Sequence, residues 1–232
     1  MVVSEFENLP AEAVAERLCA DLEEIRKDLL QLQADREVWR DVTGAVKDVN
    51  DPETSGYWLS HYSNVYVASQ IMAVRRTIRG NAEQVSLARV LSGLARRPDV
   101  VTVEYQERLV ERTGVDAGVG EYLIRNFITE FSNGSGQLDP EVPLRDQSRL
   151  FEGAPASVID WADRMIAHRY PLNAEPPPAP LFRDIDESIE IAREIYQKYR
   201  ALLTGVYDAI EHLGLPLGWH RAFERPLYEP DF

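Results

Sequence analysis

Arg164 and His168 are the two residues whose types and spacing best suit a chemical reaction. They are four positions apart in a stretch with helical character, so the pattern predicts that both side chains project from one face near the end of a helix. A guanidinium binds phosphate oxygens, and an imidazole moves a proton at neutral pH. This pair is the minimum set for metal-independent cleavage of RNA, in which the ribose hydroxyl attacks the adjacent phosphate. The alternative is structural, because the helix dipole favours a histidine in a last helical turn whatever its function.

The sequence lacks the residue spacing that metal sites and dinucleotide-binding sites require. None of the four histidines stands three residues after a glutamate or four residues from another histidine, and Cys19 is the only cysteine. Di-iron, zincin and thiolate-cluster sites are therefore not expected. Gly114, Gly118 and Gly120 lie between short helical stretches rather than after a strand, which argues against a dinucleotide fingerprint. The sequence predicts no metal and no cofactor.

Several short motifs occur along the chain in an order that is typical of one family. They are the string from Asp163 to Tyr170, an arginine-ended helix followed by Ser86-Leu87, a helix from Asp184 to Gly205 with Tyr196 and Tyr199, and a tail with Trp219, Phe223 and Pro226. In this order the chain resembles the HEPN superfamily of helical ribonuclease toxins and RNA-binding domains, and most of all its abortive-infection phage-resistance proteins. The resemblance covers about residues 30–232.

The resemblance implies an endoribonuclease that acts as a toxin or in phage defence. His168 and Arg164 would be catalytic, and Arg169, Arg76 and Arg79 would bind RNA. Tyr170 matches a tyrosine that some HEPN toxins carry as a site of inactivating modification, although it precedes Pro171 and also suits packing at the helix exit. The resemblance further implies a homodimer and a protein partner such as an antitoxin.

One departure from the HEPN pattern leaves two functions open. The family's motif has an arginine, four to six intervening residues and then histidine, but here Asp163, Ala162 and Trp161 stand five, six and seven positions before His168. The cation is then Arg164, or it comes from Arg76 or Arg79 across the bundle, or the nuclease activity is absent. If it is absent, we expect a catalytically silent dimeric interaction or regulatory module.

The apolar spacing predicts an all-α, irregular helical bundle in a single domain, 1–232. A long N-terminal helical region, 10–49, has a possible kink or break near Asp35, and a long C-terminal helix, 184–214, follows a proline-rich connector, 171–183. Residues 137–155 lack clear periodicity and are expected to wrap the surface, and an aromatic tail, 215–232, is expected to dock on the bundle or a partner. The other expected helices are 56–79, one capped by Asn81 and closed by Pro98, 102–113, 117–131 and 155–168.

Charge and composition limit the partners. A formal net charge of −14 argues against diffuse nucleic-acid binding, although Arg75, Arg76 and Arg79 form a local basic cluster. We find no secretory signal at the start of the sequence and no stretch long and apolar enough for a membrane span. A single cysteine fits a reducing compartment, so a cytoplasmic location without membrane contact is expected.

Overall fold

The computed structural model describes residues 6–49, 52–79, 84–167 and 177–207. The regular secondary structure in these ranges is helical. The one exception is an isolated β-bridge between Thr102 and Gln137. This confirms the all-α prediction. No helix in the described ranges combines the length and the apolar character that crossing a membrane requires.

The helices run in the following order. They are α1 (Ala11–Val49), α2 (Pro52–Ile78), α3 (Leu87–Arg96), the 3-10 turn η1 (Pro98–Val100), α4 (Val103–Thr113), α5 (Ala117–Asn126), the π-helical η2 (Phe127–Phe131), α6 (Glu141–Arg149), α7 (Gly153–Trp161), the π-helical η3 (Ala162–Ala167) and α8 (Phe182–Thr204).

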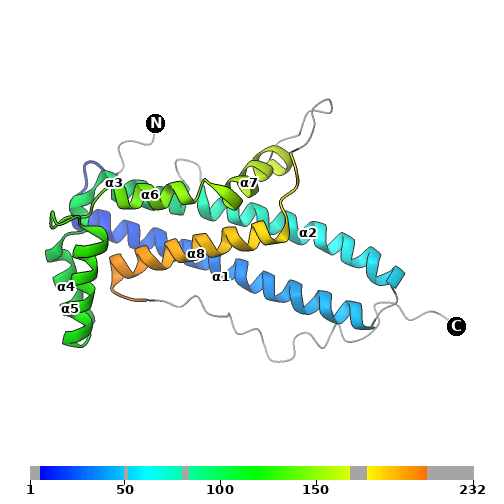
Figure 1. Cartoon of the computed structure of the whole chain (residues 1–232), viewed down its shortest axis with the longest axis horizontal. Coiled ribbons are helices and arrows are strands. Elements are labelled where there is room, and N and C mark those ends of the chain that lie inside the picture. Colours follow the sequence, from blue (N-terminus) through cyan, green and yellow to red (C-terminus); the bar gives the residue numbers. More distant parts are fainter. Residues whose placement is uncertain (1–5, 50–51, 80–83, 168–176, 208–232) are drawn as a thin grey trace.

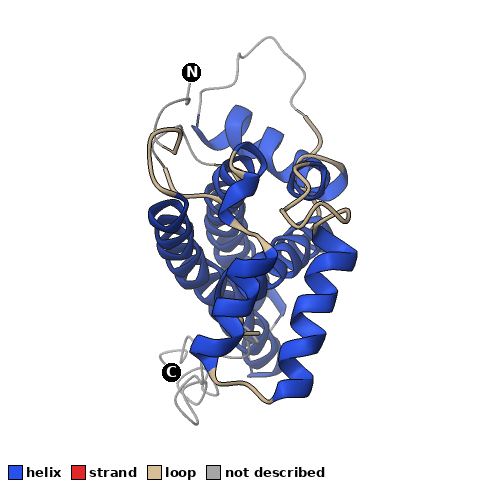
Figure 2. Ribbon diagram, turned by 90° about the vertical axis from the view of Figure 1, so that its left-hand side faces the viewer, coloured by secondary structure: helices blue, strands red, loops and turns tan. Residues whose placement is uncertain are grey.

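The long helices α1, α2 and α8 lie lengthwise and pack on one another (Figure 1). A second layer of shorter helices, α3, α6 and α7, covers one side of them, and α4 and α5 stand across one end (Figures 1 and 2). The hydrophobic core fills the space between these layers and draws on both. Segments that are far apart in the sequence, such as α2 and η3, are therefore brought into contact.

Helix α1 has the apolar stripe that its sequence predicts. Its stripe residues are almost completely buried: Val14, Leu18, Leu22, Ile25, Leu29 and Leu32. The helix continues through Asp35 without a break, because Asp35 accepts a hydrogen bond from Gln31 one turn earlier, at 2.6 Å, and another from Gln70 of α2, at 3.5 Å. Of the kink or break allowed near Asp35, the break is therefore wrong.

Helix α8 begins almost where expected and ends earlier. The Asp184 carboxylate accepts a hydrogen bond from the backbone N–H of Leu181 at 2.7 Å, which caps the first turn. The helix ends at Thr204 because Gly205 adopts a left-handed conformation, with φ of +70°. The prediction of a helix over 184–214 is wrong at this end. The tail, 215–232, lies outside the described residues.

Two further predictions are corrected. Ser86, rather than Asn81, caps the third helix, since its Oγ accepts from the backbone N–H of Arg89 at 3.4 Å. The segment 137–155, expected to wrap the surface, contains α6, which packs on α3 and buries Val142. Its apolar pattern was too short to show a helical period.

Candidate functional site

The π-helical segment η3 contains the described part of the string from Asp163 to Tyr170, which is residues 163–167. In a π-helix the backbone hydrogen bonds run from i to i+5. Residues 162–167 therefore form a π-helix rather than the expected α-helix, and the shared face of Arg164 and His168 stays a prediction, because His168 lies outside the described residues. Ala162 is fully buried, and Ile166 packs against the core, so η3 is fixed on the bundle. Such π-helical turns often occur at functional sites.

Asp163 anchors η3 to the end of α2. Its carboxylate accepts a short hydrogen bond from Nε of Arg75 and lies 3.6 Å from Nη1 of Arg79. The side chain of Arg75 is mostly covered, while that of Arg79 is 57% exposed. Two guanidiniums therefore share one carboxylate, which leaves one formal positive charge beside η3. We call these three residues the arginine–aspartate cluster.

Arg164 lies outside this cluster. Its Nε is 2.7 Å from Oδ1 of Asp160, one turn earlier in α7, and both side chains are about half exposed. A surface pair of this kind contributes little to stability, because solvent screens both charges. The structure thus places the predicted catalytic arginine in an exposed local ion pair.

Arg76 also points away from η3. Its Nη2 and Nε donate to the two carboxylate oxygens of Asp28 on α1, at 2.7 and 3.1 Å. Two of the three arginines predicted to bind substrate are therefore separated, with Arg79 facing η3 and Arg76 facing α1. Of the cations that could reach the motif from across the bundle, the structure favours Arg79.

Arg75 was predicted only as a member of a basic cluster, and its pairing with Asp163 was not predicted. The one sequence signal for this pairing was Asp163, an acidic residue at a position where the HEPN pattern places an arginine. The two residues are 88 positions apart, so nothing in the local pattern could pair them. His168, Arg169 and Tyr170 lie outside the described residues, and so does the first part of the connector, 171–176.

An aromatic cluster fixes the chain where it re-enters the bundle at Phe182. The Phe182 ring stacks on Trp39 of α1 at 5.8 Å and on Tyr66 of α2 at 6.3 Å. Burial raises the pKa of the Tyr66 hydroxyl, and the nearby Asp186 raises it further. Both flanks of the 168–181 segment are consequently attached to α2, one through Asp163 and the other through this cluster.

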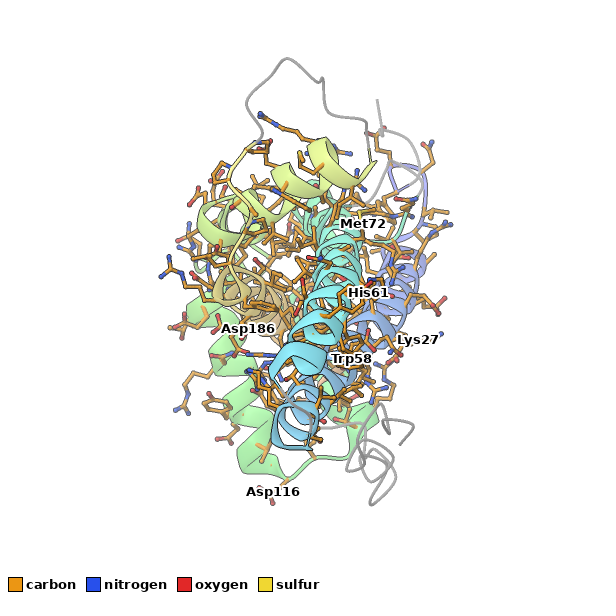
Figure 3. The ribbon with its side chains drawn as sticks, turned by 90° about the vertical axis from the view of Figure 1, so that its right-hand side faces the viewer. Lys27, Trp58, His61, Met72, Asp116 and Asp186 are labelled. Atoms are coloured by element: carbon orange, nitrogen blue, oxygen red, sulfur yellow. The ribbon has the colours of Figure 1, made fainter. Side chains whose placement is uncertain are left out.

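His61 is the one histidine among the described residues. It lies exposed on α2, and Figure 3 shows it on the same helix as Met72 and Trp58. Among the described residues, no group of three histidine, cysteine, aspartate or glutamate side chains has the arrangement to hold a metal ion. The distance between His61 and the cluster along α2 makes it a useful control residue.

Comparison with known proteins identifies no relative. No family model matches the chain, and neither a curated protein nor a solved structure matches it.

Proposed function

We propose that this chain is a HEPN-like, metal-independent endoribonuclease with His168 as its acid–base residue and Arg79 as its phosphate-binding cation. The arginine–aspartate cluster is the observation that carries the proposal. His168 follows directly on Ala167, the last residue of η3, and Asp163 holds that segment against Arg75 and Arg79. The HEPN pattern has an arginine before the histidine, and this chain lacks it there. In the proposal, Arg79 of α2 supplies that cation instead.

The reaction needs only these side chains and the RNA. A base removes the proton of a ribose 2′-hydroxyl, the 2′-oxygen bonds to the adjacent phosphorus, and the bond from phosphorus to the 5′-oxygen breaks. The proton returns to the leaving 5′-oxygen, giving a 2′,3′-cyclic phosphate and a 5′-hydroxyl. A guanidinium next to the phosphorane stabilises the charge that develops on its oxygens. Arg79 fits this role because its side chain is exposed and it shares its carboxylate with Arg75.

RNA cleavage in EDTA tests this proposal directly. Wild-type protein is expected to yield products with 2′,3′-cyclic phosphate ends. His168→Ala should lower the rate by about 10²-fold or more, which is the usual contribution of a general acid or base. His61→Ala, which changes the exposed histidine of α2, should leave the rate within about twofold. Cleavage of no RNA by the wild type, or equal rates for wild type and His168→Ala, would contradict the proposal.

A matched arginine pair tests the cation. Arg79→Ala should slow cleavage by about 10²-fold, as expected for the loss of one charge-stabilising donor. Arg76→Ala, three residues away on the same helix but paired with Asp28, should change the rate by less than about threefold. A larger loss with Arg76→Ala than with Arg79→Ala would show that the structural assignment of the two arginines is reversed.

A second function is favoured by the pairing of the arginines around η3. Arg75 and Arg79 share Asp163, and Arg164 pairs with Asp160. With these cations occupied, the chain would serve as a catalytically silent, dimeric interaction module. That function predicts that His168→Ala leaves any cellular effect of the protein intact while fold and oligomeric state are preserved. The predicted homodimer and protein partner remain part of both proposals.

A further inference from the structure

A cavity of about 580 Å³ lies between α1 and α4, with Thr204 at the end of α8 as part of its wall. It is near the end of the bundle where α4 and α5 stand, away from α7 (Figures 1 and 2). Its size falls within the range of small-molecule sites, about 300–1,000 Å³. The cavity is thus separate from the arginine–aspartate cluster and independent of the proposed nuclease function.

The rim of the cavity carries two facing rows of opposite charge. Glu12 and Glu16 occupy successive turns of α1, and Arg108 and Arg112 occupy successive turns of α4. The first pair is closed, because Nη1 of Arg108 donates to Oε1 of Glu12 at 2.9 Å.

The second pair is open. Within the described ranges neither Glu16 nor Arg112 forms an ion pair, although both line the cavity and are exposed. A carboxylate and a guanidinium are therefore presented on opposite walls, and neither has an ion-pair partner among the described residues.

The wall behind the open pair is apolar and electrically neutral. Ala15, Leu109 and Cys19 contribute to it, and the Tyr105 hydroxyl is already committed, donating to the carbonyl oxygen of Leu203 at 2.7 Å. Burial raises the pKa of Tyr105 to about 12 and also raises the pKa of the Cys19 thiol, so both groups are uncharged at neutral pH. The net result is a charged pair in front of an apolar recess.

We propose that this cavity binds a free α-amino acid with an apolar side chain. Its carboxylate pairs with Arg112, its ammonium pairs with Glu16, and its side chain packs against Leu109 and Cys19. A zwitterion fits better than a simple anion or cation, because either of these would leave one of the two rim charges without a partner. An arginine recognises a carboxylate through two parallel hydrogen bonds, which gives direction as well as strength.

Alkylation of Cys19 provides the test, because it is the only cysteine in the chain and lines the cavity. The rate of modification by iodoacetamide would be followed by mass spectrometry on the full chain at pH 8. Valine, leucine, methionine, phenylalanine and tryptophan serve as probes at up to 10 mM. At least one is expected to slow alkylation, and the best would be compared with its decarboxylated amine and with the acid that lacks its amino group. Each of these should bind at least about tenfold more weakly, since each loses one charge-assisted contact.

Two variants and one control make the assignment specific. Arg112→Gln should abolish the preference for the amino acid over its amine, and Glu16→Gln should abolish the preference over the deaminated acid. Arg125→Gln on α5, an exposed arginine that does not line the cavity, should change neither preference. Failure of all five amino acids to protect Cys19 would overturn the proposal, as would protection that both rim variants leave unaltered. A third outcome would also overturn the proposal: Cys19 reacts slowly in the absence of any ligand, and Phe223→Ser makes this reaction faster. That result would show that the chain's own tail fills the cavity.

Discussion

Four tyrosine hydroxyls in the described part of the chain lie in surroundings that disfavour their ionised form, and one of them is Tyr62. Burial is the main cause for Tyr66, Tyr105 and Tyr199, and it raises the pKa of each. Tyr199 also donates to Oδ2 of the buried Asp146 at 2.9 Å, and the negative charge of this carboxylate raises its pKa further. Each folded-state pKa is therefore above the value of about 10 that a tyrosine has in an unfolded chain.

These shifts predict a loss of stability at alkaline pH. A group with a raised folded pKa contributes its full stabilisation below the unfolded pKa and loses it as the pH rises towards the folded value. The free energy of unfolding should thus fall between pH of about 10 and 12, as measured by urea titration at a series of pH values. Tyr105→Phe should make this decline shallower, whereas Tyr57→Phe, which changes a side chain that is 83% exposed, should not. A decline of equal steepness in Tyr105→Phe and wild type would contradict the prediction.

The arginine–aspartate cluster shows at the same scale how one residue can serve two functions. Asp163 fixes η3 to α2 through Arg75 and Arg79, and it also occupies the guanidiniums that a phosphate would approach. In the proposed nuclease, RNA would compete with this carboxylate for Arg79. The exposed position of Arg79 makes such an exchange possible without unfolding η3.

At the scale of elements, backbone conformation decides where α8 ends. Gly205 has φ of +70°, and a Cβ atom built there would lie 3.2 Å from Cγ of Leu109 on α4. The position combines a left-handed backbone with a close approach of a neighbouring helix. The stop at this residue overrides the apolar spacing that continues beyond it in the sequence.

A pair of glycine substitutions tests this interpretation. Gly205→Ala should lower the free energy of unfolding by about 1–2 kcal/mol, because a side chain in this conformation is strained. Gly44→Ala in α1 should raise it by about 0.5–1 kcal/mol, since an added Cβ there meets nothing within 4 Å and alanine favours the helix. Urea denaturation measures both. Stabilisation by Gly205→Ala would mean that the helix end is not fixed by the left-handed turn.

At the scale of the whole molecule, α1 connects the long helices with the layer of shorter helices. It packs against α2, α3 and α8, and its buried stripe belongs to the single core cluster of the described residues. Arg200 of α8 also pairs with Glu23 of α1, and Cys19 of α1 lies 3.9 Å from the carbonyl oxygen of Leu203. This connectivity favours cooperative unfolding as one unit.

Coincident unfolding curves would test that cooperativity and the predicted single domain. Tryptophan fluorescence and far-UV circular dichroism should give one common midpoint in urea. Leu22→Ala, which opens a cavity at a fully buried position of α1, should shift both curves together by about 2–5 kcal/mol. Leu144→Ala on α6, where the side chain is 40% exposed, should shift them by less than about 1 kcal/mol. Separate midpoints for the two probes would show that parts of the chain unfold independently.

The sequence alone determined the features that depend on helical periodicity. The stripe from Val14 to Leu32 and the stripe from Ile185 to Leu202 identified α1 and α8, because residues three and four apart must share a helical face. The all-α class followed from these stripes. The helix end at Thr204, ten residues before the end predicted for the helix over 184–214, and the helix within 137–155 were missed, since a glycine is compatible with continuation and α6 has only nine residues.

Only the tertiary structure decided which side chains meet. Asp163 with Arg75, and Glu12 with Arg108, are pairs between residues 88 and 96 positions apart, and their contact depends on how whole helices pack. The same packing closes one charged pair at the cavity rim and leaves Glu16 and Arg112 apart. Helical periodicity is a local property of the chain, whereas ion pairs between helices require the positions of two axes, which no single segment specifies.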